Sequence, residues 1–237
     1  MFNLKNAEVP IVTSNNNRIL ASVSHDLRNP LSAIIYAIDF LIEGNNDNFD
    51  EESNFIAKSI KYSAKEALDM VNDLMDVTQA NSGKFNVNLD HKIDIGEVIE
   101  RSIQLTKHLY YNKKIQIETN IENDISLINL DQKRMKQILV NIISNSIKYS
   151  EENTKITINA RLYNNFLEIL IKDQGFGMCP EELQIALSDY GVIDGRRIDS
   201  FGLGIPLIKH LVEIQKGIID IKSEKSIGTE FFIRFPI

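Results

Sequence analysis

The segment LASVSHDLRNPLSAIIYAIDFLI (residues 20–42) carries the pattern that decides the fold of the first part of the chain. Its apolar or small residues recur at alternating steps of four and three, the heptad seam of helices that pack side by side. The seam positions are Leu20, Ser24, Leu27, Leu31, Ile34, Ile38 and Leu41. The pattern predicts one helix over residues 13–42, ended by the loop composition of EGNNDNFDE (residues 43–51).

The same spacing returns in a second helix that we expect to end near Gly83. Its seam positions are Ile56, Ile60, Ser63, Ala67, Met70, Leu74 and Val77. A hairpin of two such helices cannot bury its apolar stripe alone, whereas pairing with a second copy gives a four-helix bundle. We therefore predict a homodimer through residues 13–82. The periodicity alone is equally compatible with a plain coiled coil that carries no chemistry.

Composition narrows the class of protein further. The 237 residues are 43% apolar and 25% charged, enough to form a packed core. The net charge of −7 argues against nucleic-acid binding, which needs a basic surface. The single cysteine, Cys179, excludes an internal disulfide framework. No apolar run approaches the ~20 residues of a membrane span, so we expect a cytoplasmic chain or the cytoplasmic part of a membrane-associated protein.

Beyond Gly83 the chain mixes strand-like and helix-like periods without regular alternation. This predicts an α+β sandwich, with helices on one face of a mixed sheet. We expect strands over residues 84–94, 114–121, 125–130, 155–163, 166–173, 217–223 and 229–235. We expect helices over residues 95–111, 131–150 and 206–215, and a glycine-containing loop over 174–204.

The first helix carries a polar group that a plain coiled coil does not need. His25 lies one position past the seam, so it is expected to face solvent, where a neutral imidazole is nucleophilic. Asp26 can orient the ring or take its proton, and Asn29 shares the face of His25 at i+4. Pro30 removes one rung of the helix ladder beside them. The alternative is a surface histidine next to a tolerated kink.

Three further patterns suggest a phosphate-bearing ligand. NIISNSIKYS (residues 141–150) places Asn141, Asn145 and Lys148 on one helix face, where amide oxygens can ligate Mg²⁺ and the ammonium can meet phosphate. IKDQGFGM (residues 171–178) ends a strand at Asp173, before a glycine turn. FGLGIPLIK (residues 201–209) precedes a helix N-terminus, which favours anions. Taken singly, each is also compatible with a solvated face or a simple turn.

Together and in this order, the motifs resemble those of the sensor histidine kinases of two-component systems. SHDLRNPL resembles their H box, NIISNSIKYS the N box, DQGFG the G1 box and GLGI the G2 box. The resemblance implies an N-terminal segment (residues 1–12), a dimerisation and phosphotransfer domain (13–82) and a catalytic ATP-binding domain of the Bergerat type (83–237).

The resemblance also implies roles for single residues. His25 would accept the γ-phosphoryl group with Asp26 as base, and Asn29 would position a water for dephosphorylating a response regulator. Asn145, with Asn141, would hold Mg²⁺. The residues implied to reach ATP are Lys148 and Tyr149 at the phosphates or nucleotide, Asp173 at the adenine amine, and Gly175, Gly177, Gly202 and Gly204, which would shape the pocket and its lid.

The chain departs from the family pattern at three places. The aromatic F box is reduced to ALSDYGVID, the lid over residues 188–200 is short, and EIQKG replaces a common His-Gly-Gly run. Three functions therefore stay open at this point. They are an autokinase that passes phosphate to an aspartate of a receiver domain, a net regulator phosphatase, and a phosphotransfer scaffold without ATP binding.

Overall fold

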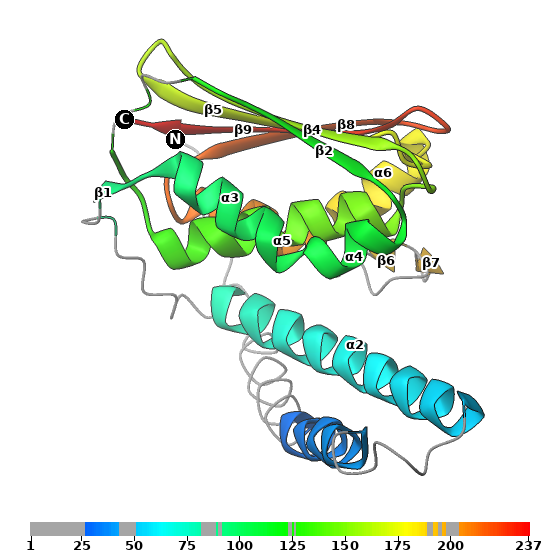
Figure 1. Cartoon of the computed structure of the whole chain (residues 1–237). Coiled ribbons are helices and arrows are strands. Elements are labelled where there is room, and N and C mark those ends of the chain that lie inside the picture. Colours follow the sequence, from blue (N-terminus) through cyan, green and yellow to red (C-terminus); the bar gives the residue numbers. More distant parts are fainter. Residues whose placement is uncertain are drawn as a thin grey trace, which may run out of the picture. The chain divides into compact units, whose positions relative to one another are not determined.

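The computed structural model describes residues 27–42, 51–81, 89, 92–122, 125, 127–188, 192–193, 196–197 and 204–237. His25, Asp26 and Gly202 lie outside these residues. The chain divides into two compact units, Met1–Phe85 and Asn86–Ile237, and each is described by itself. Figure 1 shows their elements along the chain.

The first unit is a pair of antiparallel helices, as its heptads predict. Residues 27–42 form one helix and α2 (Glu51–Asn81) the other. The Arg28 guanidinium donates to Asn72 Oδ1 from two nitrogens, at 3.1 and 2.8 Å. Near the opposite end, Lys61 pairs with Asp39. Because the early residue of one helix meets the late residue of the other, the helices run in opposite directions.

Alanine and β-branched side chains form the buried apolar part of the described helix pair. The buried apolar side chains of the described part are Ile38, Ala57, Ala64 and Val71. The three α2 members are spaced by seven, so they form a stripe one position past the predicted seam at Ile56. Among the described seam positions Ile38 is buried, whereas Leu27 at 46%, Ile34 at 42% and Leu41 at 46% are exposed. The pair therefore leaves an apolar stripe uncovered.

The second unit is built on a five-stranded mixed sheet, in the order β2-β4-β5-β9-β8. Its strands are β2 (Gln116–Ile121), β4 (Lys155–Tyr163), β5 (Phe166–Lys172), β8 (Ile218–Glu224) and β9 (Gly228–Pro236). β2 pairs with β4 in parallel and every other pairing is antiparallel. Asn164 and Asn165, both at positive φ, join β4 to β5, as the primed turn of a two-residue hairpin requires.

Helices cover one face of this sheet, as Figure 1 shows for α3 and α5. The helices are α3 (Ile95–Leu105), α4 (Lys107–Asn112), α5 (Gln132–Lys148), α6 (Pro180–Leu187) and α7 (Gly204–Glu213). Alternate strand residues such as Ile158, Ile169 and Ile233 are fully buried against them, as are Ile142 of α5 and Leu211 of α7. The predicted hairpin of helices followed by an α/β sandwich with a mixed sheet is confirmed.

Two smaller pairings complete the described strands. β1 (Lys92–Ile93) pairs with β3 (Ile128–Asn129), and β6 (Val192–Ile193) pairs with β7 (Arg196–Arg197). No helix among the described residues is long and apolar enough to cross a membrane.

Candidate functional site

Asp173 is the point where three elements of the second unit meet. It follows β5, and only 5% of it is exposed. Its Oδ1 accepts hydrogen bonds from the backbone N–H groups of Gly175 and Thr229, each at 2.9 Å. Its Oδ2 accepts from the hydroxyl of Ser146 on α5, at 3.0 Å. These bonds tie the end of β5 to β9 and to the last turn of α5.

The turn after Asp173 and the start of β9 each require a glycine. Gly177 has a φ of +58°, and a Cβ atom there would lie 1.9 Å from the carbonyl oxygen of Glu224. Gly228, at the start of β9, has a φ of +131°, and a Cβ atom would lie 2.2 Å from the carbonyl oxygen of Asp173. L-residues pay for such backbone angles with steric strain. Gly177 therefore lets the turn pack directly onto the end of β8, and Gly228 lets the start of β9 pack onto the strand end that carries Asp173.

The polar face of α5 borders the same place. Asp131 caps the start of α5, where its Oδ1 accepts from the Arg134 N–H at 3.0 Å. Ile138, Leu139, Ile142 and Ile143 fill the core side, with no measurable exposure. Asn141 and Asn145 are half-buried on the other side, and their side-chain amides make no hydrogen bond with another described residue. Their oxygens are therefore open to a ligand.

The C-terminal end of α5 brings further predicted residues to this region. Lys148 and Tyr149 are exposed, with the ammonium 5.7 Å from the ring centroid. The Tyr149 carbonyl accepts from the Phe176 N–H at 2.9 Å, and a Cβ atom on Gly175 would come within 2.6 Å of that carbonyl oxygen. The glycine turn thus lies directly against the end of the helix.

The start of α7 closes the group. A Cβ atom on Gly204, the first residue of α7, would lie 3.1 Å from Asn145 Nδ2. Asn145, Asp173, Gly175 and Gly204, far apart in the sequence, therefore lie around one end of α5. The N-terminus of this ten-residue helix, whose first N–H groups have no partner within the helix, is beside an amide that can ligate a cation.

Three residues that sequence reasoning missed support this arrangement. Ser146 and Thr229 donate to Asp173, as described above. Lys113, between α4 and β2, donates its ammonium to the carbonyls of Ile147, Lys148 and Ser150 at 3.0, 2.9 and 2.8 Å. A cation at the C-terminus of a helix is favourable. This contact could not be predicted from the sequence, because Lys113 lies 34 or more residues from its partners.

Burial and hydrogen bonds shift pKa values on α7 and at the start of α6. Desolvation by burial lowers the pKa of His210 on α7, against a smaller opposing effect of Glu213. The Cys179 backbone N–H donates to Glu182 Oε2 at 2.8 Å and lowers the pKa of that carboxyl group. This bond caps the start of α6, a helix that lies within the segment expected to be loop.

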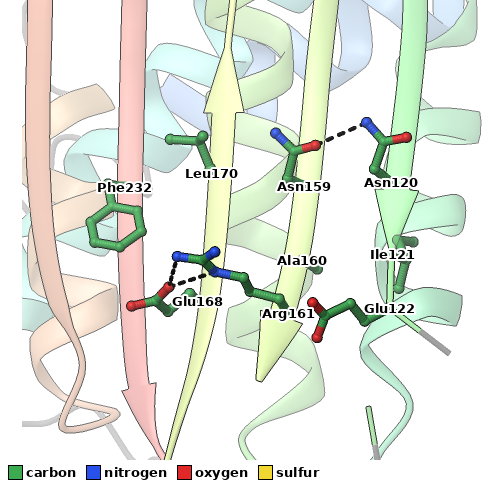
Figure 2. Close-up of a pocket in the computed structure, with 9 residues that line it drawn as sticks. All are labelled: Asn120, Ile121, Glu122, Asn159, Ala160, Arg161, Glu168, Leu170 and Phe232. Atoms are coloured by element: carbon green, nitrogen blue, oxygen red, sulfur yellow. Dashed lines mark hydrogen bonds and ion pairs between the residues drawn. The ribbon is translucent and has the colours of Figure 1, made fainter. Parts of the chain in front are cut away.

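A separate hollow of about 560 Å³ lies on the face of the sheet away from the helices, as Figure 2 shows. Its side chains come from β2, β4, β5 and β9, and from Glu122. The Arg161 guanidinium pairs with Glu168 at 2.8 Å, and Asn120 Nδ2 donates to Asn159 Oδ1 at 2.9 Å. None of the predicted site residues lines it, so the hollow is distinct from the group around α5.

The residues predicted for phosphotransfer belong to the first unit. Of these, the structure describes Asn29, which is exposed on the helix over residues 27–42. Pro30, in the first turn of the described part, is exposed as well.

Comparison with known families assigns both units. Residues 130–237 match the family model of the histidine kinase-, DNA gyrase B-, and HSP90-like ATPases. Residues 15–83 match the His Kinase A (phospho-acceptor) domain. By class, the second unit is therefore an ATPase-like domain that follows a phospho-acceptor region.

Individual relatives agree with this class. An uncharacterized sensor-like histidine kinase of Rhizobium meliloti is 30% identical over 225 residues, covering 92% of this chain and 42% of that protein. The histidine protein kinase DivJ of Caulobacter vibrioides is 27% identical, covering 93% of this chain and 37% of its own length. The chain thus spans less than half the length of both curated relatives.

Solved structures share the fold. Full-length ShkA in complex with AMPPNP has a TM-score of 0.71 and 22% identity, covering 92% of this chain and 45% of that one. The Acinetobacter baumannii histidine kinase AdeS has a TM-score of 0.63 and 21% identity, covering 90% of this chain and 97% of that one. With both family models and these relatives, the chain belongs to the sensor histidine kinases, of which it forms a catalytic portion.

Proposed function

We propose that this chain transfers the γ-phosphoryl group of ATP to His25, and from there to an aspartate of a response regulator receiver domain. The observation that carries the proposal is the group around the end of α5. There a buried, triply hydrogen-bonded carboxylate, Asp173, lies at the same helix end as the open amide of Asn145 and the N-terminus of α7.

These residues fit the two chemically different ends of ATP. Asp173 would accept a hydrogen bond from the exocyclic amine of adenine, beside the turn formed by Gly175 and Gly177. Lys148 and Tyr149 would reach the phosphates or nucleotide, and Gly202 and Gly204 would help to shape the pocket and its lid. The solved ShkA structure, which shares this fold, holds the ATP analogue AMPPNP, and this supports ATP as the ligand.

The donor set also fits Mg²⁺. Among the described residues no group of three His, Cys, Asp or Glu could hold a metal, so these residues offer no cage made only of carboxylates. Mg²⁺ prefers oxygen ligands and keeps several of its waters while it binds phosphates. The half-buried amide oxygens of Asn145 and Asn141 suit this mode, and the ion would neutralise phosphate charge during transfer.

The same face of α5 favours transfer over hydrolysis. ATP-hydrolysing proteins of this fold carry a glutamate four residues before the metal-binding asparagine, whereas this chain has Asn141 there. An amide cannot take a proton from water. In the proposed step an imidazole nitrogen of His25 attacks the γ-phosphorus, the bond to the β-phosphate oxygen breaks, ADP leaves, and Asp26 accepts the ring proton.

The partner in the first unit would be a second copy of the chain. The exposed residues Leu27, Ile34 and Leu41 are spaced by seven, and Ile56 and Ile60 of α2 are exposed too. A stripe of this period is the surface that a four-helix bundle buries. We therefore propose a homodimer through residues 13–82.

Nucleotide binding can be tested by calorimetry with AMPPNP, with and without Mg²⁺. Asp173→Asn should weaken AMPPNP binding at least about tenfold, because a hydrogen bond to a neutral amide replaces one to a charged carboxylate. Asp220→Asn, on the exposed side of β8, should bind like wild type. Asn145→Ala should remove the gain in affinity that Mg²⁺ gives to wild type. Wild type that binds no nucleotide at millimolar concentration would favour the scaffold function instead.

A second candidate function, dephosphorylation of the regulator, is favoured by the exposure of Asn29. Its amide lies one helical turn beyond His25 in sequence and could position the attacking water. Asn29→Ala should then abolish release of phosphate from a phosphorylated receiver domain and leave autophosphorylation intact. If that variant dephosphorylates the receiver at the wild-type rate, Asn29 has no such role.

A further inference from the structure

The hydrogen bonds of Asp173 leave room for one ligand contact. A carboxylate oxygen can accept about two hydrogen bonds. Oδ1 already accepts two, from the N–H groups of Gly175 and Thr229. Oδ2 accepts one, from Ser146. One acceptor position therefore remains, and it lies on Oδ2, the oxygen held by the serine.

Ser146 is an unusual donor for its place in α5. It is 2% exposed, and a buried helical serine commonly returns its hydroxyl proton to a carbonyl of the preceding turn. Ser102 of α3 does this, donating to the Val98 carbonyl at 2.7 Å. The Ser146 hydroxyl donates instead across to the end of β5, at 3.0 Å from Asp173 Oδ2. Ser146 directly follows Asn145 in the sequence. One turn of α5 would therefore support the adenine end of the ligand through Ser146 and the phosphate end through Asn145.

We propose that Ser146 is the positioning residue that makes the site selective for a purine with a 6-amino group. This rests on the proposed function, in which Asp173 contacts adenine. The two backbone N–H groups fix Oδ1, and the serine hydroxyl fixes Oδ2 and thereby the plane of the carboxylate. The remaining acceptor position is then directed at the donor of an amino group.

The same geometry disfavours a 6-oxo purine. The oxygen of such a base would face Oδ2 without a proton between them, and unpaired buried acceptors are costly. Without the Ser146 hydroxyl, Oδ2 loses its only described partner and the carboxylate can turn about its bond to Cβ. Both the attraction for the amino group and the rejection of the oxo group would then decrease.

Three ligands and three variants test this inference on the full chain. Affinities are measured for ATP, for purine riboside triphosphate, which has hydrogen in place of the amino group, and for GTP. Ser146→Ala should bind ATP about fivefold more weakly, the loss expected for one hydrogen bond, and purine riboside triphosphate as wild type does. The preference for ATP over GTP should decrease with it. Ser146→Cys keeps a weak donor of similar size, so its affinity for ATP should lie between those of wild type and Ser146→Ala.

Ser102→Ala is the matched control, since it also removes a fully buried helical hydroxyl but one that contacts a carbonyl of its own helix. It should leave the ratio of ATP to purine riboside triphosphate affinity at the wild-type value. An equal loss for both triphosphates in Ser146→Ala, or an unchanged ratio, overturns the selectivity role while leaving nucleotide binding in place. Wild type that binds none of the three ligands overturns the proposed function and this inference with it.

Discussion

Replacing Lys113 with methionine should loosen the end of α5 that carries the proposed site. The substitution keeps an unbranched side chain, one atom shorter, but removes the ammonium that contacts the carbonyls of Ile147, Lys148 and Ser150 at 3.0, 2.9 and 2.8 Å. Each hydrogen bond contributes less than 1 kcal/mol at a half-buried position, and the charge at the helix end adds a few tenths. We expect a local loss of about 2 kcal/mol.

Hydrogen exchange read by mass spectrometry measures this loss where it occurs. About 2 kcal/mol corresponds to roughly 30-fold faster exchange of the amides near residues 145–150. Lys114→Met is the control, because Lys114 is exposed and its side chain makes no hydrogen bond with the described residues. Exchange in Lys113→Met that matches Lys114→Met would refute the reasoning, since the three contacts would then contribute nothing to the helix end.

Three more predictions concern a strained glycine, a half-buried histidine and an exposed isoleucine. Gly177→Ala, with φ at +58° and the Glu224 carbonyl 1.9 Å from the new Cβ atom, should destabilise the fold by more than about 2 kcal/mol in urea unfolding. Gly96→Ala, in the first turn of α3, should stay within about 1 kcal/mol of wild type. Because burial lowers the pKa of His210, the unfolded chain binds its proton more readily. The contribution of the neutral His210 to the free energy of unfolding is therefore fully present above about pH 6.5. It is lost as the pH falls below that value. The melting temperature of His210→Gln should decrease less than that of wild type between pH 7 and 5.5, and equal decreases would contradict this. Ile34→Asp should shift the chain to monomers in sedimentation, whereas an unchanged dimer would place the interface elsewhere.

Much of the fold could be predicted because apolar residues recur with the period of a helix or of a strand. β4 begins and ends at Lys155 and Tyr163, as its alternation indicates, and the Asn164-Asn165 turn follows directly. The helix expected over residues 95–111 is interrupted at Thr106, whose hydroxyl bonds the Ile103 carbonyl at 3.0 Å. α6 was missed because its eight residues are too few for a period and begin at a proline in a glycine-containing segment.

The site was predictable only as far as its motifs reach. Asp173 could be placed at a strand end, and Asn145 on a helix face, from local spacing alone. Ser146 and Lys113 could not be found this way, because their partners lie 27 and at least 34 residues away and a serine or lysine carries no pattern of its own. The roles given to His25, Asp26 and Asn29 remain predictions from the motif.

The most direct test is incubation of the chain with γ-labelled ATP and Mg²⁺, comparing wild type with His25→Gln. We expect label on wild type alone, lost in acid and stable in base, as a bond between phosphorus and an imidazole nitrogen should be. Label that persists in His25→Gln would contradict His25 as the acceptor. No label on either protein, with AMPPNP still bound, would contradict autophosphorylation by this chain and favour the phosphatase function.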